Sequence, residues 1–285
     1  MGSALFGRDV DDGRYVHMNR RWIDEMASVV RRHAPTVAAL QEVPPLAVAD
    51  LGRLTGMRAA HALMPPLLGP VGLRGRLAAR NPDLWRTHEG AANVVLVADP
   101  WTIVPGGVWT VRHNPPGFVT ARMRRLGLPP REAVHWLLEP RRLVAVRIRH
   151  PSGRTLTVAS AHVHNSLVWE VIAEEVRRVL PMILERVPPD EPVLFAGDLN
   201  AAGADHPALR ALTSAGLTES TTNALGLDHI FHRGLDEVRA PSRLPRETRE
   251  LPITWRGSER RVLLSDHDLV EATYALPAGP DVGRS

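Results

Sequence analysis

Five short segments, far apart in the chain, each change from an aliphatic run to polar side chains within one or two residues. They cover residues 40–43, 160–164, 195–201, 226–231 and 264–269. A short apolar run that stops at a polar residue is typical of a buried strand whose C-terminal end reaches a surface. We therefore expect a β-rich fold in which several strand ends supply side chains to one shared cleft.

The pattern between these segments predicts both hairpins and helices. Residues 143–148 alternate, a turn follows at 151–153, and a second strand over 155–161 would complete a hairpin. Helical spacing predicts helices over 19–33 and 166–186, with Pro181 as a kink in the second. Shorter helices are expected over 50–54, over 131–138 and between Pro207 and Gly216. Further strands are expected at 37–40, 94–97, 193–196, 227–231, 262–264 and 269–274, and irregular chain at 64–89 and over much of 111–139.

Such a mixture indicates an α+β fold. We expect a four-layer α/β/β/α sandwich, with two mainly antiparallel sheets packed together and helices outside. No internal repeat or second core is evident, so residues 1–275 are interpreted as one domain and residues 276–285 as a disordered tail.

Composition excludes several classes of protein. There is no cysteine, which rules out a disulfide scaffold and a thiolate metal site. All 35 cationic side chains are arginine, a planar and permanently charged group suited to phosphate oxygens. The net charge of +4 permits a polyanionic partner without requiring one. The sequence lacks an apolar run of membrane-spanning length and the layout of a secretory signal, so we expect a cytoplasmic protein.

The first two segments and one nearby strand carry candidate ligands. Glu42 is a hard oxygen donor of the kind that Mg²⁺ takes, and we predict that it binds the metal. His162 is expected to contact a non-bridging phosphate oxygen or the leaving oxygen. If its strand continues, His164 lies on the same face about 7 Å away, and it is a candidate for substrate binding. Asn93, at the start of another strand, is a second candidate for phosphate contact.

The segment at 197–200 is the most specific of the five. A glycine allows a sharp exit from the strand, and a carboxylate and a carboxamide then lie two residues apart. We predict that Asp198 accepts a proton from an attacking water molecule. Asn200 would orient that water or donate to a phosphate oxygen.

The last two segments are best interpreted together. A histidine that stabilises a pentacovalent phosphorus must keep its proton, and a carboxylate on its far nitrogen raises its pKa. Asp228 and His267 are predicted to form this pair, and Asp266 is a second candidate metal ligand. His229 and Asp268 should point away from their neighbours in extended backbone and are expected to be structural.

This ordered set resembles the endonuclease/exonuclease/phosphatase superfamily, which has the DNase I-like fold. The motifs are residues 41–42, His162, residues 197–200, residues 228–229 and residues 265–267, and the resemblance spans roughly residues 21–274. It implies a hydrolase of phosphodiesters or phosphomonoesters that uses Mg²⁺ or Mn²⁺. By the resemblance, Glu42 and Asp266 hold the metal, Asp198 activates water beside Asn200, and the Asp228–His267 pair stabilises the transition state.

The sequence departs from the family at its start. Members open with a strand that ends in Trp-Asn or a similar pair, and nothing before Asn19 matches it. We hypothesise that the natural chain begins upstream. In that case this sequence would leave an unpaired place inside a sheet.

The sequence is also compatible with other functions. Within the hydrolase class, nuclease and small-molecule phosphatase are not separated, so the partner is a phosphate ester and possibly a nucleic acid. A catalytically impaired scaffold protein on the same fold is the main alternative. A zinc hydrolase would use the imidazoles and one carboxylate but leave Glu42 and Asn200 without a role. Its ligands would be His162, His164, Asp198 and His267. Arginines that could contact nucleic acid are Arg122, Arg124, Arg125, Arg141 and Arg142.

Overall fold

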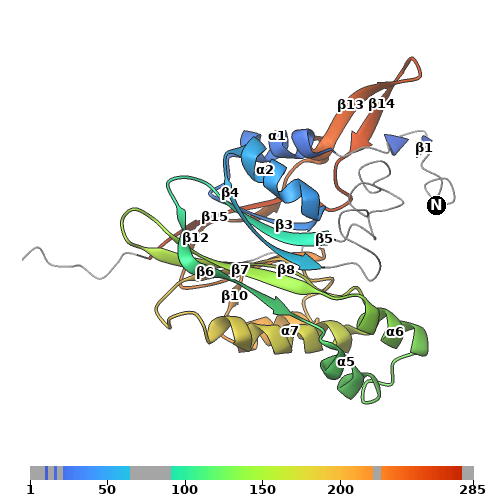
Figure 1. Ribbon diagram of the computed structural model, residues 1–285, viewed down its shortest axis with the longest axis vertical. Coiled ribbons are helices and arrows are strands. Elements are labelled where there is room, and N and C mark those ends of the chain that lie inside the picture. The colour runs from blue at the N-terminus through green and yellow to red at the C-terminus, as the bar shows by residue number, and fades with distance from the viewer. Residues whose placement is uncertain (1–9, 12–15, 18–21, 65–90, 221–225, 278–285) are drawn as a thin grey trace, which may run out of the picture.

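The computed structural model describes residues 10–11, 16–17, 22–64, 91–220 and 226–277 (Figure 1). The α-helices are α1 (Ile23–His33), α2 (Val48–Thr55), α5 (Pro116–Met123), α6 (Pro130–Leu138), α7 (Trp169–Leu184) and α8 (Pro207–Ser214). The first eight strands are β1 (Val10–Asp11), β2 (Val16–His17), β3 (Val37–Val43), β4 (Arg58–Met64), β5 (Ala91–Val97), β6 (Thr102–Arg112), β7 (Arg142–Arg149) and β8 (Thr155–His162). The others are β9 (Val193–Asp198), β10 (Thr218–Glu219), β11 (Asp228–Arg233), β12 (Asp236–Arg243), β13 (Glu250–Trp255), β14 (Ser258–Leu263) and β15 (Val270–Ala275).

Two sheets form the middle of the molecule. One has six strands in the order β10-β11-β9-β8-β7-β6, and the other has three in the order β3-β5-β4. Helices α1 and α2 cover the outer face of the three-stranded sheet, and α7 lies below the six-stranded sheet (Figure 1). The expected four-layer α/β/β/α sandwich is therefore confirmed.

Alternation along the central strands explains the layers. In β7, Val144, Val146 and Ile148 pack between the two sheets, whereas Leu143 and Ala145 face the core between the six-stranded sheet and α7. The side chains of β5 alternate in the same way between the core that separates the two sheets and the core beneath helices α1 and α2. Strands buried on both faces have almost continuous apolar sequences. This burial is why both strands stand out in the sequence.

The pairing brings the functional strands side by side. The β7–β8 hairpin forms as predicted, with Val146 opposite Val158. Strand β8 then runs parallel to β9, which in turn pairs with β11 in the antiparallel sense. A parallel neighbour requires a crossover connection, and α7 supplies it. The C-terminal ends of β8 and β9 consequently lie at the same edge of the sheet.

Some sequence predictions of local structure were wrong. Residues 111–139 were expected to be mostly irregular, but they begin with the end of the long strand β6 and include α5, and the rest of β6 was not predicted. Strands β4, β12 and β13 were not predicted. The predicted excursion at 64–89, most of the chain before α1 and most of the predicted tail lie outside the described residues. Within the described ranges, none of the helices has the length and apolar character needed to cross a membrane.

Candidate active site

Three neighbouring strands place His162, Asp198 and Asp228 in one row. His162 is the register partner of Asp198 across the β8–β9 pair, and Asp228 is the partner of Asp198 across β9–β11. The Nε2 atom of His162 lies 3.3 Å from Oδ2 of Asp198. His267, which follows β14, completes the arrangement with Nε2 3.8 Å from that same oxygen. The structure thus brings together four of the predicted site residues.

The predicted Asp228–His267 pair is present. Nδ1 of His267 lies 2.9 Å from Oδ2 of Asp228, which fits an N–H donor and a carboxylate acceptor. The hydrogen bond to Asp228 raises the pKa of His267 to about 9, and burial only partly opposes this shift. His267 therefore carries its proton at neutral pH. Its Nε2 is directed towards Asp198.

The pKa of Asp198 is also raised, but for a carboxyl group this shift favours the neutral form. Burial raises the pKa of Asp198 to about 6, against the hydrogen bond that the backbone N–H of Asn200 donates, and the negative charge of Asp228 adds to the increase. That hydrogen bond joins the Asn200 nitrogen to Oδ1 of Asp198 at 2.9 Å. Asp198 is thus mainly ionised above pH 6, within reach of neutral conditions for a general base.

The turn after β9 depends on glycine. Gly197 has φ +148°, and a Cβ atom there would lie 1.9 Å from the carbonyl oxygen of Ala161. Only glycine allows the β8 and β9 backbones to approach this closely. Beyond the strand, Asn200 has φ 49° and its amide donates to the carbonyl oxygen of Val163 at 2.9 Å. The side-chain amide of Asn200 therefore ties the β9 exit to the β8 exit beside the site.

Glu42 reaches the site from the other sheet. It lies at an irregularity in the β3–β5 pairing with φ 55°, and its side chain is 42% exposed. Its Oε1 atom lies 4.0 Å from Nδ1 of His162. The amide of the adjacent Gln41 also reaches β8, where it donates to the hydroxyl of Ser160 at 3.0 Å. Glu42 and Asp198 thus flank the same imidazole.

The donor set fits a divalent cation. Carboxylate oxygens of Asp198 and Asp228 lie within 4.8 Å of each other and of His267, which as an imidazolium bound to Asp228 is a neighbour of the ion and not one of its ligands. Glu42 and the exposed Asp266, which directly precedes His267, add two further carboxylates. Carboxylate oxygens are the ligands that Mg²⁺ and Mn²⁺ prefer. The His267 nitrogen that faces Asp228 is already used by their hydrogen bond.

His164 and Asn93 make different contacts. Strand β8 ends at His162, so His164 does not continue the same face. Its ring is fully buried and lies 3.4 Å from Glu139, on α6's side of the molecule. Asn93 is also buried, and its amide donates to the carbonyl oxygen of Arg142 at 2.5 Å. Their substrate-binding roles remain predictions, and the position of His164 does not favour the zinc-hydrolase alternative.

His229 and Asp268 have structural contacts, as expected from extended backbone. Nε2 of His229 donates to the carbonyl oxygen of Ala201 at 2.7 Å. Asp268 accepts from the guanidinium of Arg249 and lies 3.1 Å from that of Arg243.

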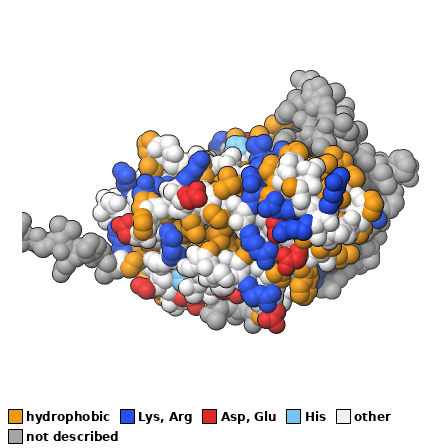
Figure 2. Space-filling view, turned by 90° about the horizontal axis from the view of Figure 1, so that it is seen from below, with side chains coloured by type: hydrophobic (Ala, Val, Ile, Leu, Met, Phe, Trp, Pro, Cys, Tyr) orange, Lys and Arg blue, Asp and Glu red, His pale blue; other side chains and the backbone are white. Residues whose placement is uncertain are grey.

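Arg141, one of the arginines predicted as candidates for nucleic-acid contact, lies near the site. It is buried, its Nη2 donates to Oε1 of Glu139 at 2.8 Å, and its charge lowers the pKa of Asp198. Arg122 and Arg125 instead contact Glu174 of α7, where they join α5 to α7. On the face seen from below, arginine side chains lie among hydrophobic patches and do not form one continuous stripe (Figure 2). Of these three arginines, Arg141 is therefore the one whose charge acts on Asp198.

Several solved structures share this fold. A mannosyl-6-phosphatase of Bacteroides thetaiotaomicron VPI-5482 is 14% identical, with a TM-score of 0.61 over 89% of this chain and 90% of that one. The human Nocturnin catalytic domain is 15% identical, with a TM-score of 0.56 over 91% and 88%. An endonuclease/exonuclease/phosphatase from Beutenbergia cavernae DSM 12333 is 18% identical, with a TM-score of 0.56 over 89% and 66%. A search of curated proteins gave no match.

The sequence profile of the endonuclease/exonuclease/phosphatase family matches residues 16–267. This range includes every residue of the site described above. The predicted resemblance is confirmed, and the chain belongs to the endonuclease/exonuclease/phosphatase family.

Proposed function

We propose that this protein is a divalent-metal-dependent phosphoesterase, which hydrolyses a phosphodiester or phosphomonoester by in-line attack of water. The main support is that two groups 3.8 Å apart have well-separated pKa values, about 6 for Asp198 and about 9 for His267. Between about pH 6 and pH 9 one group is a carboxylate and the other an imidazolium. A base and a charged donor thus coexist in one site.

Each residue then has a defined task. Asp198 accepts a proton from the attacking water, and the neighbouring Asn200 holds the turn that positions it. His267 donates through Nε2 to an oxygen on phosphorus as negative charge develops there, while Asp228 keeps its proton in place. His162, between Glu42 and Asp198, is placed to contact the phosphate or the leaving oxygen.

Glu42 and Asp266 would hold Mg²⁺ or Mn²⁺. When bound, such an ion polarises the phosphoryl oxygens and offsets the charge of the transition state. The carboxylates of the site otherwise repel an anionic substrate, so a cation is electrostatically required for phosphate to approach Asp198.

The substrate class is proposed from the shared fold and from Arg141. One structure with this fold is a phosphatase by its description, and Nocturnin also shares the fold. A buried arginine at the site, Arg141, suits a phosphate group of either ester class. We therefore propose a phosphate ester whose charged group enters beside Arg141, and nucleic acid remains one candidate.

The test is a panel of substrates with two matched variants. Purified protein with Mg²⁺ or Mn²⁺ is given bis-p-nitrophenyl phosphate, plasmid DNA and inositol phosphates. Asp198→Asn removes the proposed base, and Asp190→Asn makes the same change at an exposed turn before β9. We expect turnover by the parent and the Asp190 variant alone. Equal background from all three proteins on every substrate would instead support a scaffold protein.

A further inference from the structure

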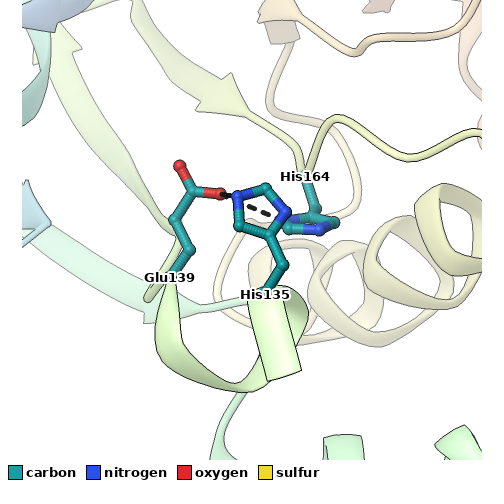
Figure 3. Close-up of side chains that lie close together, drawn as sticks. All are labelled: His135, Glu139 and His164. Carbon is teal, nitrogen blue, oxygen red and sulfur yellow. Dashed lines mark ion pairs between the residues drawn. The ribbon is translucent and has the colours of Figure 1, made fainter. Parts of the chain in front are cut away.

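A second group of ligand-type side chains lies between α6 and the loop after β8. The His164 cluster consists of His135, Glu139 and His164, which point towards one another (Figure 3). His135 and Glu139 are one helical turn apart, with Nε2 of His135 3.1 Å from Oε2 of Glu139. Nδ1 of His164 lies 3.4 Å from that same oxygen. The three ligand atoms all lie within 4.8 Å of one another.

The buried atoms of this cluster lack hydrogen bonds. His164 has no exposed surface, and neither of its ring nitrogens has a hydrogen-bond partner among the described residues. The same holds, within those residues, for Oε2 of Glu139. Buried polar groups normally have partners, because a buried donor or acceptor without one has lost its hydrogen bonds to water and gained nothing in return. Nδ1 of His164 and Oε2 of Glu139 lie only 3.4 Å apart and interact with each other, and a cation bound between them would satisfy both atoms better than this long contact does.

The surrounding contacts leave these atoms available for that ligand. Oε1 of Glu139 accepts from Arg141 at 2.8 Å, so Oε2 is the oxygen that faces the imidazoles. The backbone N–H of His164 donates to the buried carboxylate of Glu175, which also accepts from the Trp136 indole of α6 at 2.6 Å. Glu175 thus fixes the His164 backbone relative to α6.

The chemistry selects zinc over magnesium. Two imidazoles and one carboxylate form a donor set used by zinc sites, whereas Mg²⁺ takes oxygen ligands. Ligands about 2.0–2.2 Å from a tetrahedral zinc ion lie about 3.3 Å apart, close to two of the separations here. We propose that His135, Glu139 and His164 form a zinc site separate from the Asp198, Asp228 and His267 group.

Glu132 supports this geometry from outside. Its Oε1 atom is buried, has no hydrogen-bond partner among the described residues, and lies 3.9 Å from Nε2 of His164. A histidine that binds metal through one nitrogen usually donates its other N–H to a carboxylate. Binding through Nδ1 of His164 would leave Nε2–H for Glu132. The site then needs a fourth ligand, which water or a substrate group would supply.

The test uses the full chain and Zn²⁺ or Co²⁺ as the probe. Zinc affinity is measured by calorimetric titration, and the visible absorption of tetrahedral Co²⁺ reports the geometry. His135→Ala removes a ligand at an exposed position, so the fold should tolerate it. Glu132→Gln removes only the outer carboxylate, and His61→Ala is a control at an exposed histidine on β4. Circular dichroism verifies the fold of each variant.

We expect one zinc ion that His61→Ala and Asp198→Asn both retain. Glu132→Gln should weaken zinc binding about 10- to 100-fold, as loss of an outer carboxylate does elsewhere, and His135→Ala should weaken it more. Zinc should also raise the unfolding temperature of the parent but not of His135→Ala. Absence of tetrahedral Co²⁺ absorption in the parent, its persistence in His135→Ala, or its loss in Asp198→Asn would overturn the proposal.

Discussion

Replacing Asp228 by asparagine removes a negative charge from the far nitrogen of His267 and keeps a hydrogen-bond acceptor of similar shape. Asp228 is the main cause of the high pKa of His267, about 9 against an ordinary value of 6.5. The same carboxylate also helps to raise the pKa of Asp198. Both pKa values should therefore fall in Asp228→Asn, and the whole pH–rate profile should move to lower pH.

The size of the effect follows from the protonated fraction of His267. At about pH 8 a group with a pKa of about 9 is roughly 90% protonated, whereas one with the ordinary pKa is roughly 3% protonated. The rate should thus fall by up to about 30-fold near pH 8 and only about twofold near pH 6.5. Thirtyfold is an upper limit, because Asp198 and Asp266 still raise the pKa of His267 in the variant.

Initial rates with bis-p-nitrophenyl phosphate, from pH 5 to pH 10 at saturating Mg²⁺, measure both limbs of the profile. Nuclear magnetic resonance of labelled histidine gives the pKa of His267 independently of turnover. Asp190→Asn is the matched control and should leave the profile unchanged. An alkaline limb that stays near pH 9 in Asp228→Asn would refute the role assigned to the pair.

Four further outcomes follow from the structure. The rate of the parent should decline below about pH 6, because Asp198 gains a proton there, and Asp198→Asn should lose turnover at every pH. Gly197→Ala should destabilise the fold by about 3 kcal/mol or more in urea unfolding, since the new Cβ would meet the Ala161 carbonyl at a positive φ. Glu175→Ala should cost about 3–5 kcal/mol in the same assay, because the Trp136 indole and other buried donors lose their acceptor. Treatment with EDTA should abolish turnover and added Mg²⁺ should restore it; unchanged rates would exclude the metal requirement.

Local signals were sufficient for the central strands. The β7–β8 hairpin has alternating residues on both sides of a Pro-Ser-Gly turn, and β9 leads directly into Gly197 and Asp198. The pairing of Asp228 with His267 was predicted from the chemical need for a protonated imidazole, and the structure has it at 2.9 Å. These features depend on short stretches of sequence or on a known reaction.

Other features depend on contacts between distant residues. Strand β12 is exposed along nearly its full length, so no alternation of apolar and polar residues marks it. Strand β4 does alternate, with Ala60, Ala62 and Met64 buried, but alanine is a weak strand former. The His164 cluster was missed because its three residues come from a helix and a distant loop. The spacing of His135 and Glu139 on a predicted helix was the one local signal for it.

The hydrogen bond from Gln41 to Ser160 crosses from one sheet to the other beside the site. Glu42 lies on the three-stranded sheet, whereas His162 and Asp198 lie on the six-stranded sheet. The distance between Glu42, the proposed metal ligand, and Asp198, the proposed base, therefore depends on how the valines between the two sheets pack. Replacing Val146 or Val158 by a larger or smaller residue would shift the two sheets relative to each other and so displace Glu42 relative to His162 and Asp198. Turnover in this protein should consequently respond to substitutions deep in its interior that touch neither substrate nor ion.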